Sequence, residues 1–321
     1  MEGSIPLTCN YEKSMMLQTA AIKPSIQPSS SSQGFEDVIR DLIDRRFFVE
    51  TEQYADLSNW LDKRRKYKSC GIISGSRGAG KSRASKEYDA LVTGRRGSMR
   101  RIKPLHSLYI KAFSSWGTID LCRQSLNFFN HGAKKGSPMD VRLRTWETFE
   151  DFGLELLLVD NGHVLSEKIL FDLVECYDEF KIATVLIGPE KELENRLVLL
   201  GLRKKFNSHH KFPSLSPKQV VGVLKAFKRD FLSLPEDIEF FDGEIVHAIC
   251  QASGGNPSKL EQPGCDFNTI SEILVLSIAQ SSSNGNFHLD KRVLKEVLYD
   301  FGVNVELTVE ESNDTETGIN G

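Results

Sequence analysis

The chain has 321 residues, of which 40% are hydrophobic and 26% charged, and this composition predicts a globular protein with a sizeable core. Its six cysteines form no C-x-x-C pair, which argues against a zinc site or a disulfide framework and favours a reducing cytoplasm. No apolar run is long enough for a membrane-spanning helix or a signal peptide, so we expect no membrane partner. The net charge is −3, but residues 305–321 carry five acidic residues and no Lys or Arg, so residues 1–304 are mildly basic.

The first part of the chain is predicted to hold a tail and two helices. Residues 1–34 end in a segment rich in Pro, Ser and Gln that can bury little apolar surface, which predicts disorder. Apolar residues at helical spacing predict helices over residues 35–50 and about residues 52–66. The second helix ends in a basic run, KRRKYK at residues 63–68. This run is either a solvated helix end favoured by the macrodipole or a patch that contacts phosphates.

A P-loop pattern follows directly. The segment from Gly75 to Ser82, GSRGAGKS, fits G-x-x-x-x-G-K-[ST] at every fixed position, between a predicted strand and a predicted helix. Glycines let successive backbone N–H groups point at one phosphate, and the helix N-terminus adds positive charge. We expect Lys81 to reach the β- and γ-phosphates and Ser82 to bind Mg²⁺. The alternative is a Gly-rich turn that matches by chance. The predicted nucleotide-binding residues here are Gly75, Ser76, Arg77, Gly78, Ala79, Gly80, Lys81, Ser82 and Arg83.

Strand and helix signals then alternate along the chain. Strands are predicted at residues 105–110, 154–160 and 183–187, and helices at about residues 117–130, 139–151, 167–179 and 190–200. The second of these strands is apolar and ends in Asp160, which is the Walker B pattern. An aspartate at the C-terminal edge of a central parallel strand would hold Mg²⁺ beside the P-loop. The alternative is an ordinary buried strand that ends at a turn.

The strand signal stops after Phe212, and residues 215–301 are predicted to be helical. Alternating strands and helices followed by a run of helices predict an α/β fold with a parallel sheet domain and a small helical domain. The predicted parts are a disordered tail at residues 1–34, a nucleotide-binding domain at 35–213, a helical lid domain at 214–302 and an acidic disordered tail at 303–321.

These motifs resemble those of the AAA+ ATPases and, more narrowly, of the transposition regulators TnsC and TniB, relatives of MuB, from Tn7-like and CRISPR-associated transposons. The resemblance covers about residues 45–300, and its most specific piece is LSNWLDKRRKYKSC at residues 57–70. The other matching stretches lie at residues 156–160, 184–188 and 203–206. The resemblance implies a prokaryotic protein with a P-loop AAA+ parallel sheet followed by a helical lid.

The resemblance also implies an activity. Such proteins bind ATP and Mg²⁺ between neighbouring subunits, form homo-oligomeric rings or filaments around duplex DNA, and connect target selection to the transposase. The implied partners are a TniQ-type target-selection protein, often with a CRISPR effector, and a TnsB-type DDE transposase. Arg203 and Lys205 fall in the region of the arginine that acts on a neighbour's site, and Lys259 falls where the lid has its second sensor. Lys134 and Lys135 fall in the loop that resembles the DNA-tracking segment.

The sequence departs from the family pattern at several positions, and one of them is Asn207, which falls near where an arginine is expected. Asn161 replaces the glutamate that follows the Walker B aspartate, Pro189 replaces a polar sensor, and Ile119 replaces a DNA-contacting lysine. Asparagine can position water but cannot accept its proton. We therefore expect ATP binding with weak hydrolysis, from a catalytic set of Lys81, Asp160, Asn161, Arg203 and Lys205.

Three other interpretations remain open at this stage. A different carboxylate, or a partner protein, could complete the hydrolytic site. The chain could instead be another P-loop enzyme, such as a nucleotide kinase or a DNA-remodelling motor. It could also be a scaffold that uses nucleotide only to hold its subunits together.

Overall fold

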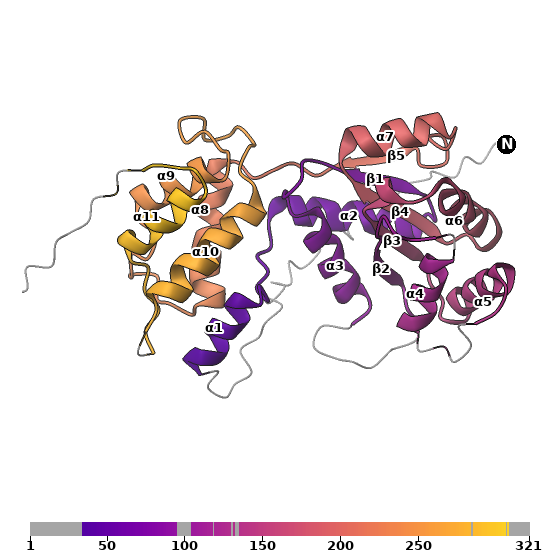
Figure 1. The fold of residues 1–321 in the computed structure, drawn as a ribbon, viewed down its shortest axis with the longest axis horizontal. Helices are drawn as coiled ribbons and strands as arrows, with labels where there is room; N and C mark the ends of the chain where they lie inside the picture. Colours follow the sequence, from indigo (N-terminus) through magenta and orange to yellow (C-terminus); the bar gives the residue numbers. More distant parts are fainter. Residues whose placement is uncertain are drawn as a thin grey trace, which may run out of the picture.

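The computed structural model describes residues 34–94, 104–117, 119–129, 131, 135–283, 285–305 and 307. Lys134, one of the two predicted DNA-binding lysines, lies outside the described residues. Within the described ranges the chain forms a sheet domain with helices on both faces and a separate group of helices beside it (Figure 1). No described helix combines the length and the apolar character needed to cross a bilayer.

The sheet domain is built on parallel strands in the order β2-β3-β4-β1-β5. The strands are β1 (Gly71–Ser74), β2 (Ser107–Lys111), β3 (Leu156–Asp160), β4 (Ala183–Gly188) and β5 (Ser208–Lys211). All residues of β1, β3 and β4 are buried, as expected for parallel strands that are covered on both faces. The predicted α/β fold class, a parallel sheet followed by C-terminal helices, is confirmed, and within the described residues the sheet has five strands.

Helices cover the two faces of the sheet unequally. The helices of this domain are α2 (Glu52–Lys66), α3 (Lys81–Val92), α4 (Asp120–Phe128), α5 (Pro138–Asp151), α6 (Glu167–Phe180) and α7 (Glu190–Leu199), with a short 3₁₀ turn at Gly162–Val164. Alternate residues of each strand point to opposite faces, so Leu157 and Val159 of β3 pack with α4, α5 and α6. Leu156 and Leu158 pack on the other face with α2 and α3.

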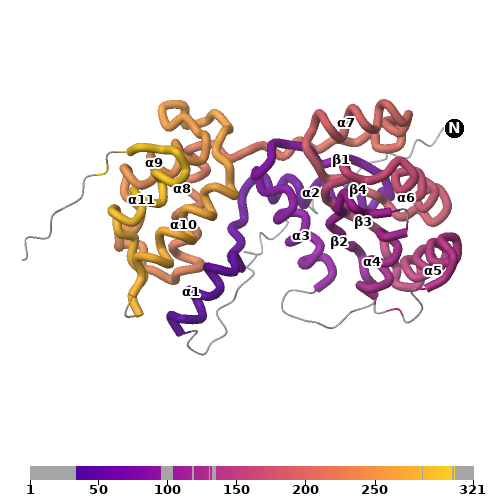
Figure 2. The backbone as a smooth tube through the Cα atoms, in the orientation of Figure 1, coloured from indigo at the N-terminus to yellow at the C-terminus, as the bar shows by residue number. Residues whose placement is uncertain are grey.

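The helical domain contains α8 (Pro217–Ala226), a π-helical turn (Phe227–Phe231), α9 (Gly243–Ala252), α10 (Phe267–Ser281) and α11 (Lys291–Asp300). Ser216 starts this domain with a reciprocal capping box to Gln219 and a proline at the first helical position. The N-terminal helix α1 (Phe35–Ile43) packs here as well, because Leu42 and Phe47 belong to the core of the helical domain. The chain therefore passes between the two domains twice, at residues 44–51 and again at residues 212–216 (Figure 2).

Two elements differ from the sequence prediction. The helix expected over residues 35–50 ends at Ile43, and residues 46–51 form an extended connection to α2. Strand β5, with the sequence SHHK, was not predicted at all. It is a polar edge strand, and among the described strands it pairs with β1 alone, so it lacks the apolar pattern that identifies a central strand. The assignment of α1 to the nucleotide-binding domain stays a prediction, although its apolar contacts lie in the helical domain.

Candidate nucleotide-binding site

The P-loop lies at the edge of the sheet where the parallel strands end. Ser74, the last residue of β1, pairs with Gly188 of β4, and Lys111 of β2 pairs with Asp160 of β3. This register brings the P-loop, the Walker B aspartate and the end of β4 to one edge. In open parallel sheets, ligands bind outside this carboxyl edge.

Close backbone packing shapes the loop itself. A Cβ atom on Gly75 would overlap the carbonyl oxygen of Phe212, so only glycine fits at the first P-loop position. Lys81 is the first residue of α3 and only 8% exposed, and its Nζ donates to the carbonyl oxygens of Gly75 (3.0 Å) and Ser76 (2.6 Å). Burial lowers the pKa of Lys81, while Asp160 and Asp266 act in the opposite direction. The ammonium group is thus held over the loop, where a phosphate would meet it.

Asp160 is held in place from two sides. It is 2% exposed, its Oδ2 accepts a hydrogen bond from the Tyr109 hydroxyl at 2.6 Å, and its Oδ1 accepts from the backbone N–H of Asn161 at 2.9 Å. The same tyrosine hydroxyl interacts with Ser82, so it joins the two predicted Mg²⁺ ligands. Burial, together with the Asp160 charge, raises the pKa of Tyr109, which keeps this phenol protonated as a donor.

A cavity of about 430 Å³ opens beside the loop. Its wall is formed by the P-loop, the start of α3, the connection before α2 and the first turns of α10. The lining residues are Arg45, Phe47, Gly78, Gly80, Lys81, Ser82, Arg83, Phe267, Asn268 and Ser271. Three cations, Lys81, Arg45 and Arg83, therefore surround a space bounded by backbone of the P-loop. This charge pattern suits a polyphosphate.

An apolar recess adjoins this cavity and shares Gly80, Arg83 and Phe267 with it. Its other walls come from the segment before α2 and the first turn of that helix, from Phe212 and Leu215, and from Ala79 and Ala84 on either side of the start of α3. The recess has a volume of only about 30 Å³, so in this conformation it offers apolar contacts at the border of the cavity and no room for a whole nucleoside. The two domains both contribute to it, since Leu215 and Phe267 belong to the helical domain.

The remaining predicted P-loop residues make local contacts. The Ser76 hydroxyl lies 2.8 Å from that of Ser214, and the exposed Arg77 side chain lies 3.5 Å from Glu192. Ala79 is buried. Arg83 donates to the carbonyl oxygen of Phe47 at 3.2 Å and pairs with Glu87 at 3.1 Å. Arg83 thereby connects α3 to the segment before α2.

Asn161 adopts a conformation that favours asparagine. Its backbone is left-handed, with φ +58° and ψ +35°, and its side-chain amide donates to the carbonyl oxygen of Ala112 at 3.2 Å. The amide is therefore fixed between the ends of β3 and β2. Pro189 caps α7 at the end of β4, and the ring of His163 lies against the neighbouring Gly188.

Arg203 and Lys205 precede β5, at the edge of the sheet opposite the P-loop of the same chain. Arg203 donates to the carbonyl oxygen of Phe206 at 2.6 Å and lies 3.6 Å from Glu194. The Lys205 ammonium lies 2.6 Å from Asp178. Their predicted action on a neighbouring subunit stays a prediction.

Lys259 and Lys135 are both exposed on loops. Lys259 lies in the connection between α9 and α10, and among the described residues it does not line the cavity. The helical-domain residues that do reach the P-loop are Asp266 and its successors Phe267 and Asn268. Lys135 lies just before α5, and its carbonyl oxygen accepts a hydrogen bond from Arg144 at 3.2 Å.

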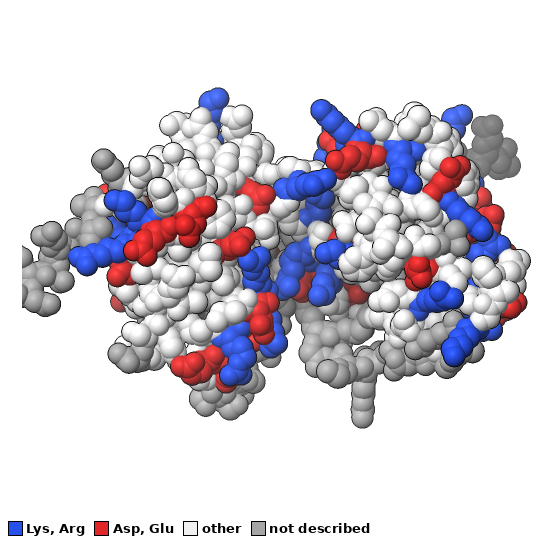
Figure 3. All heavy atoms as spheres, in the orientation of Figure 1, with Lys and Arg blue, Asp and Glu red and all other residues white. Residues whose placement is uncertain are grey.

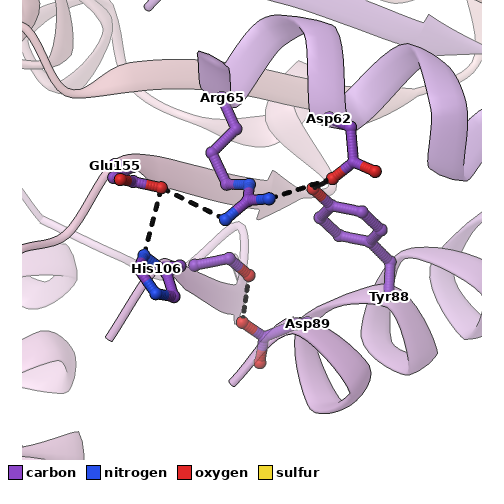
Figure 4. Close-up of polar contacts among 7 residues, drawn as sticks. Asp62, Arg65, Tyr88, Asp89, His106 and Glu155 are labelled. Atoms are coloured by element: carbon purple, nitrogen blue, oxygen red, sulfur yellow. Dashed lines mark hydrogen bonds and ion pairs between the residues drawn. The ribbon is translucent and has the colours of Figure 1, made fainter. Parts of the chain in front are cut away.

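In the basic run at the end of α2, the two arginines make contacts within the protein. Arg65 contacts Asp62 and Glu155, both at 3.2 Å, and the Tyr88 hydroxyl donates to the same Asp62 (Figure 4). His106 lies 3.2 Å from Glu155 and completes the link between α2, α3 and the sheet (Figure 4). The guanidinium of Arg64 covers the ring of Trp60 at 5.3 Å. The run lies before β1, away from the P-loop edge.

Several site residues were missed by sequence reasoning. Tyr109 lies on β2, Arg45 and Phe47 lie before α2, and Asp266 and Asn268 lie at the start of α10. In the sequence, Tyr109 looks like any aromatic residue that packs against a sheet, so no local pattern marks it as a site residue. The others reach the site only because the two domains pack together.

The residues present fit a nucleotide with its metal ion. Within the described ranges no group of three or more His, Cys, Asp or Glu side chains could hold a metal by itself. Ser82 and Asp160 therefore form an incomplete oxygen donor set, which suits Mg²⁺ that also binds phosphate oxygens and water. Lys and Arg side chains gather along the seam between the two domains (Figure 3).

A family model and solved structures are similar to parts of this chain. Residues 64–197 match the family model described as "AAA domain". The fold is similar to the crystal structure of Cdc6p from Pyrobaculum aerophilum, with a TM-score of 0.57 and 16% identity over 88% of this chain and 72% of that chain. A DnaA structure with bound AMPPCP from Aquifex aeolicus has a TM-score of 0.43 and 14% identity, over 71% of this chain and 62% of that chain.

No curated protein matches the sequence. The likeness to Cdc6p, at 16% identity, concerns the fold alone. The family match includes the P-loop and Asp160, and an AAA domain implies nucleotide binding, typically of ATP with Mg²⁺. Residues 64–197 are therefore similar to an AAA domain.

Proposed function

We propose that this protein is an ATP-dependent regulator of DNA transposition, which assembles on duplex DNA and connects target selection to the transposase. The observation that carries the ATP-dependent part is the arrangement of Lys81 and Asp160. Both are buried at one edge of the sheet, beside a cavity of about 430 Å³ that is lined by two further cations, Arg45 and Arg83. The assignment to transposition is supported by the resemblance of residues 45–300 to the TnsC and TniB regulators.

Each residue of the site has a defined task in this proposal. Lys81 and the backbone N–H groups of the P-loop bind the phosphates, and Arg45 and Arg83 add positive charge at the rim of the cavity. Ser82 and Asp160 hold Mg²⁺, which would neutralise charge on the β- and γ-phosphates. Tyr109 orients the Asp160 carboxylate through its 2.6 Å hydrogen bond.

Assembly of subunits is supported by two cations away from the site. Arg203 and Lys205 lie at the sheet edge opposite the P-loop, where only a neighbouring subunit could use them on a nucleotide. Both have carboxylate partners within the chain, Glu194 and Asp178, which hold them in defined positions. The proposed partners are a second copy of the chain, duplex DNA, a TniQ-type protein and a TnsB-type transposase.

The direct test is electron microscopy of the protein with duplex DNA and a slowly hydrolysed ATP analogue. We expect rings or filaments on DNA only with nucleotide, and retention of a TnsB-type transposase on these assemblies in a pull-down. Lys81→Ala removes the phosphate-binding ammonium and should abolish assembly. Lys86→Ala, an exposed lysine on the same helix, is the matched control and should assemble normally. Assemblies that form equally well with Lys81→Ala would contradict the proposal.

One observation favours a second candidate, a scaffold that binds ATP without hydrolysing it. The Asn161 amide is bonded to the Ala112 carbonyl oxygen and cannot accept a proton from water. In this case nucleotide would hold subunits together, and assemblies would persist. A time course of phosphate release with and without DNA separates the two candidates, because only a hydrolysing regulator releases phosphate faster on DNA.

A further inference from the structure

The first residue ahead of α10 rests on the P-loop. Asp266 caps this helix, and its Oδ1 accepts a hydrogen bond from the backbone N–H of Thr269 at 3.0 Å. Its Oδ2 lies against Gly78, so close that a Cβ atom on this glycine would overlap the carboxylate. The backbone N–H of Asn268 donates to the carbonyl oxygen of Gly78 at 3.2 Å. Two residues of the helical domain thus contact the middle of the phosphate-binding loop.

The backbone that carries this carboxylate is fixed within the helical domain. The backbone N–H of Asp266 donates to the carbonyl oxygen of Ser253 at 2.8 Å. The preceding Cys265 is fully buried and exchanges backbone hydrogen bonds with Leu215, at 2.9 and 3.1 Å. Residues 264–268 are therefore tied to the helical domain, and separating Asp266 from Gly78 requires this segment to move.

The negative charge of Asp266 would repel the phosphates of a nucleotide bound at this loop. The P-loop collects backbone N–H groups and the Lys81 ammonium for phosphate, and Asp266 brings a negative charge to the same place. The negative charges of Asp160 and Asp266 both act on Lys81, and each favours the charged form of its ammonium group. A carboxylate and a phosphate at close range repel each other, and this repulsion is strong where water is partly excluded.

We propose that Asp266 is a determinant of nucleotide affinity whose carboxylate competes with phosphate for the P-loop. ATP binding then requires the start of α10 to withdraw from Gly78, which couples occupancy of the site to the position of the helical domain. The inference deepens the proposed function, because it rests on ATP binding at this loop. It is independent of DNA and of transposition.

The test compares ATP affinity of the full-length wild type with that of Asp266→Asn, by titration with a fluorescent ATP analogue at fixed Mg²⁺ and salt. Asparagine caps helices as well as aspartate does, so this variant removes the charge and keeps the cap. Asp266→Ser provides a second, shorter cap without charge. Asp290→Asn is the matched control, because Asp290 caps α11 in the same way through the N–H of Arg292 at 2.7 Å.

We expect both Asp266 variants to bind ATP more tightly, on the order of tenfold, and Asp290→Asn to match the wild type. ATP should also increase hydrogen exchange of residues 267–270 in the wild type, since the Asn268 N–H loses its bond to Gly78. Equal or weaker ATP binding by folded Asp266 variants, or exchange that ATP leaves unchanged, would overturn the inference. A wild type that binds no ATP would instead overturn the proposed function itself, and this inference with it.

Discussion

The hydroxyl oxygen of Ser74 lies 2.6 Å from Nε2 of His209, and Nδ1 of the same ring lies 3.2 Å from Glu194. Burial lowers the pKa of His209, so the ring is neutral near neutral pH. In this neutral form, Nδ1 of His209 donates its proton to the Glu194 carboxylate, and Nε2 accepts a hydrogen bond from the Ser74 hydroxyl. The arrangement resembles a nucleophilic triad, but Ser74 is fully buried. Its consequence is structural, since it ties the last residue before the P-loop to β5 and α7.

This relationship predicts that stability depends on pH. The folded state holds His209 with a pKa below the ordinary value of about 6.5, so the unfolded chain binds the proton more readily. The contribution of His209 to the free energy of unfolding is fully present above about pH 6.5. It is lost as the pH falls through the lower pKa that His209 has in the folded state. Glu194 and Glu190 of α7 work against this shift, and Lys211 and Arg203 add to it.

The measurement is the free energy of unfolding by urea at several pH values between about 7.5 and about 5. We expect it to fall toward acid pH in the wild type and to fall less steeply in His209→Gln. His247→Gln changes an exposed histidine of α9 and should keep the wild-type slope. If the free energy of unfolding depends on pH equally in His209→Gln and in the wild type, His209 is not the cause of the pH dependence.

Substitution of Gly78 separates backbone strain from steric contact. Gly78 has φ +76° and a Cβ there would overlap Asp266, whereas Gly201 has φ +69° with open space around it. Gly201→Ala should cost roughly 1–2 kcal/mol of unfolding free energy, from the left-handed conformation alone. Gly78→Ala should cost more, because it also displaces the start of α10. Thermal or urea unfolding of both variants gives the comparison, and equal losses would mean that the Asp266 contact adds nothing.

Asn161→Glu tests whether a missing base limits hydrolysis. A positioned general base typically contributes ~10²–10⁴-fold to rate, so we expect faster phosphate release with little change in ATP affinity. Glutamate at φ +58° adds strain of roughly 1–2 kcal/mol, so the melting temperature should be measured as well. Asn161→Gly, which relieves strain without adding a base, is the control and should not gain activity.

Pro189 could keep the restored site slow, because a polar sensor is absent there. The double change Asn161→Glu with Pro189→Asn should then release phosphate faster than Asn161→Glu alone. If the wild type already hydrolyses ATP rapidly, the weak-hydrolysis prediction is wrong. His163, whose ring lies against Gly188 next to this position and whose pKa is lowered by burial, would be the next residue to replace.

The two lysines ahead of α5 in the sequence provide the DNA test. Lys134→Ala combined with Lys135→Ala should weaken binding about equally for different sequences, because lysines would contact phosphates rather than base edges. The slope of log affinity against log salt should decrease by about two units. Lys225→Ala with Lys295→Ala removes the same charge from exposed sites of the helical domain and serves as control. An unchanged salt slope in the first pair would place those two lysines in solvent.

Local patterns in the sequence were sufficient for most elements of the fold. The P-loop spacing, the apolar strand ending in Asp160 and the helical periodicities depend on neighbours a few residues apart, so they predicted the α/β class and the later helices. Strand β5 was missed for the same reason, because SHHK has no local apolar pattern and becomes a strand only through pairing with β1. The burial of Lys81 and Asp160 likewise follows from the packing of the sheet domain.

The sequence by itself determined which loop is equipped for phosphate, since glycine spacing and the following lysine define that chemistry locally. Only the tertiary structure decided what surrounds the loop. Arg45, Tyr109 and Asp266 come from a connection, a strand and a helix start that are far apart in the chain. Their proximity depends on how the helical domain packs beside the sheet, and no periodicity along the sequence encodes the position of one domain relative to another.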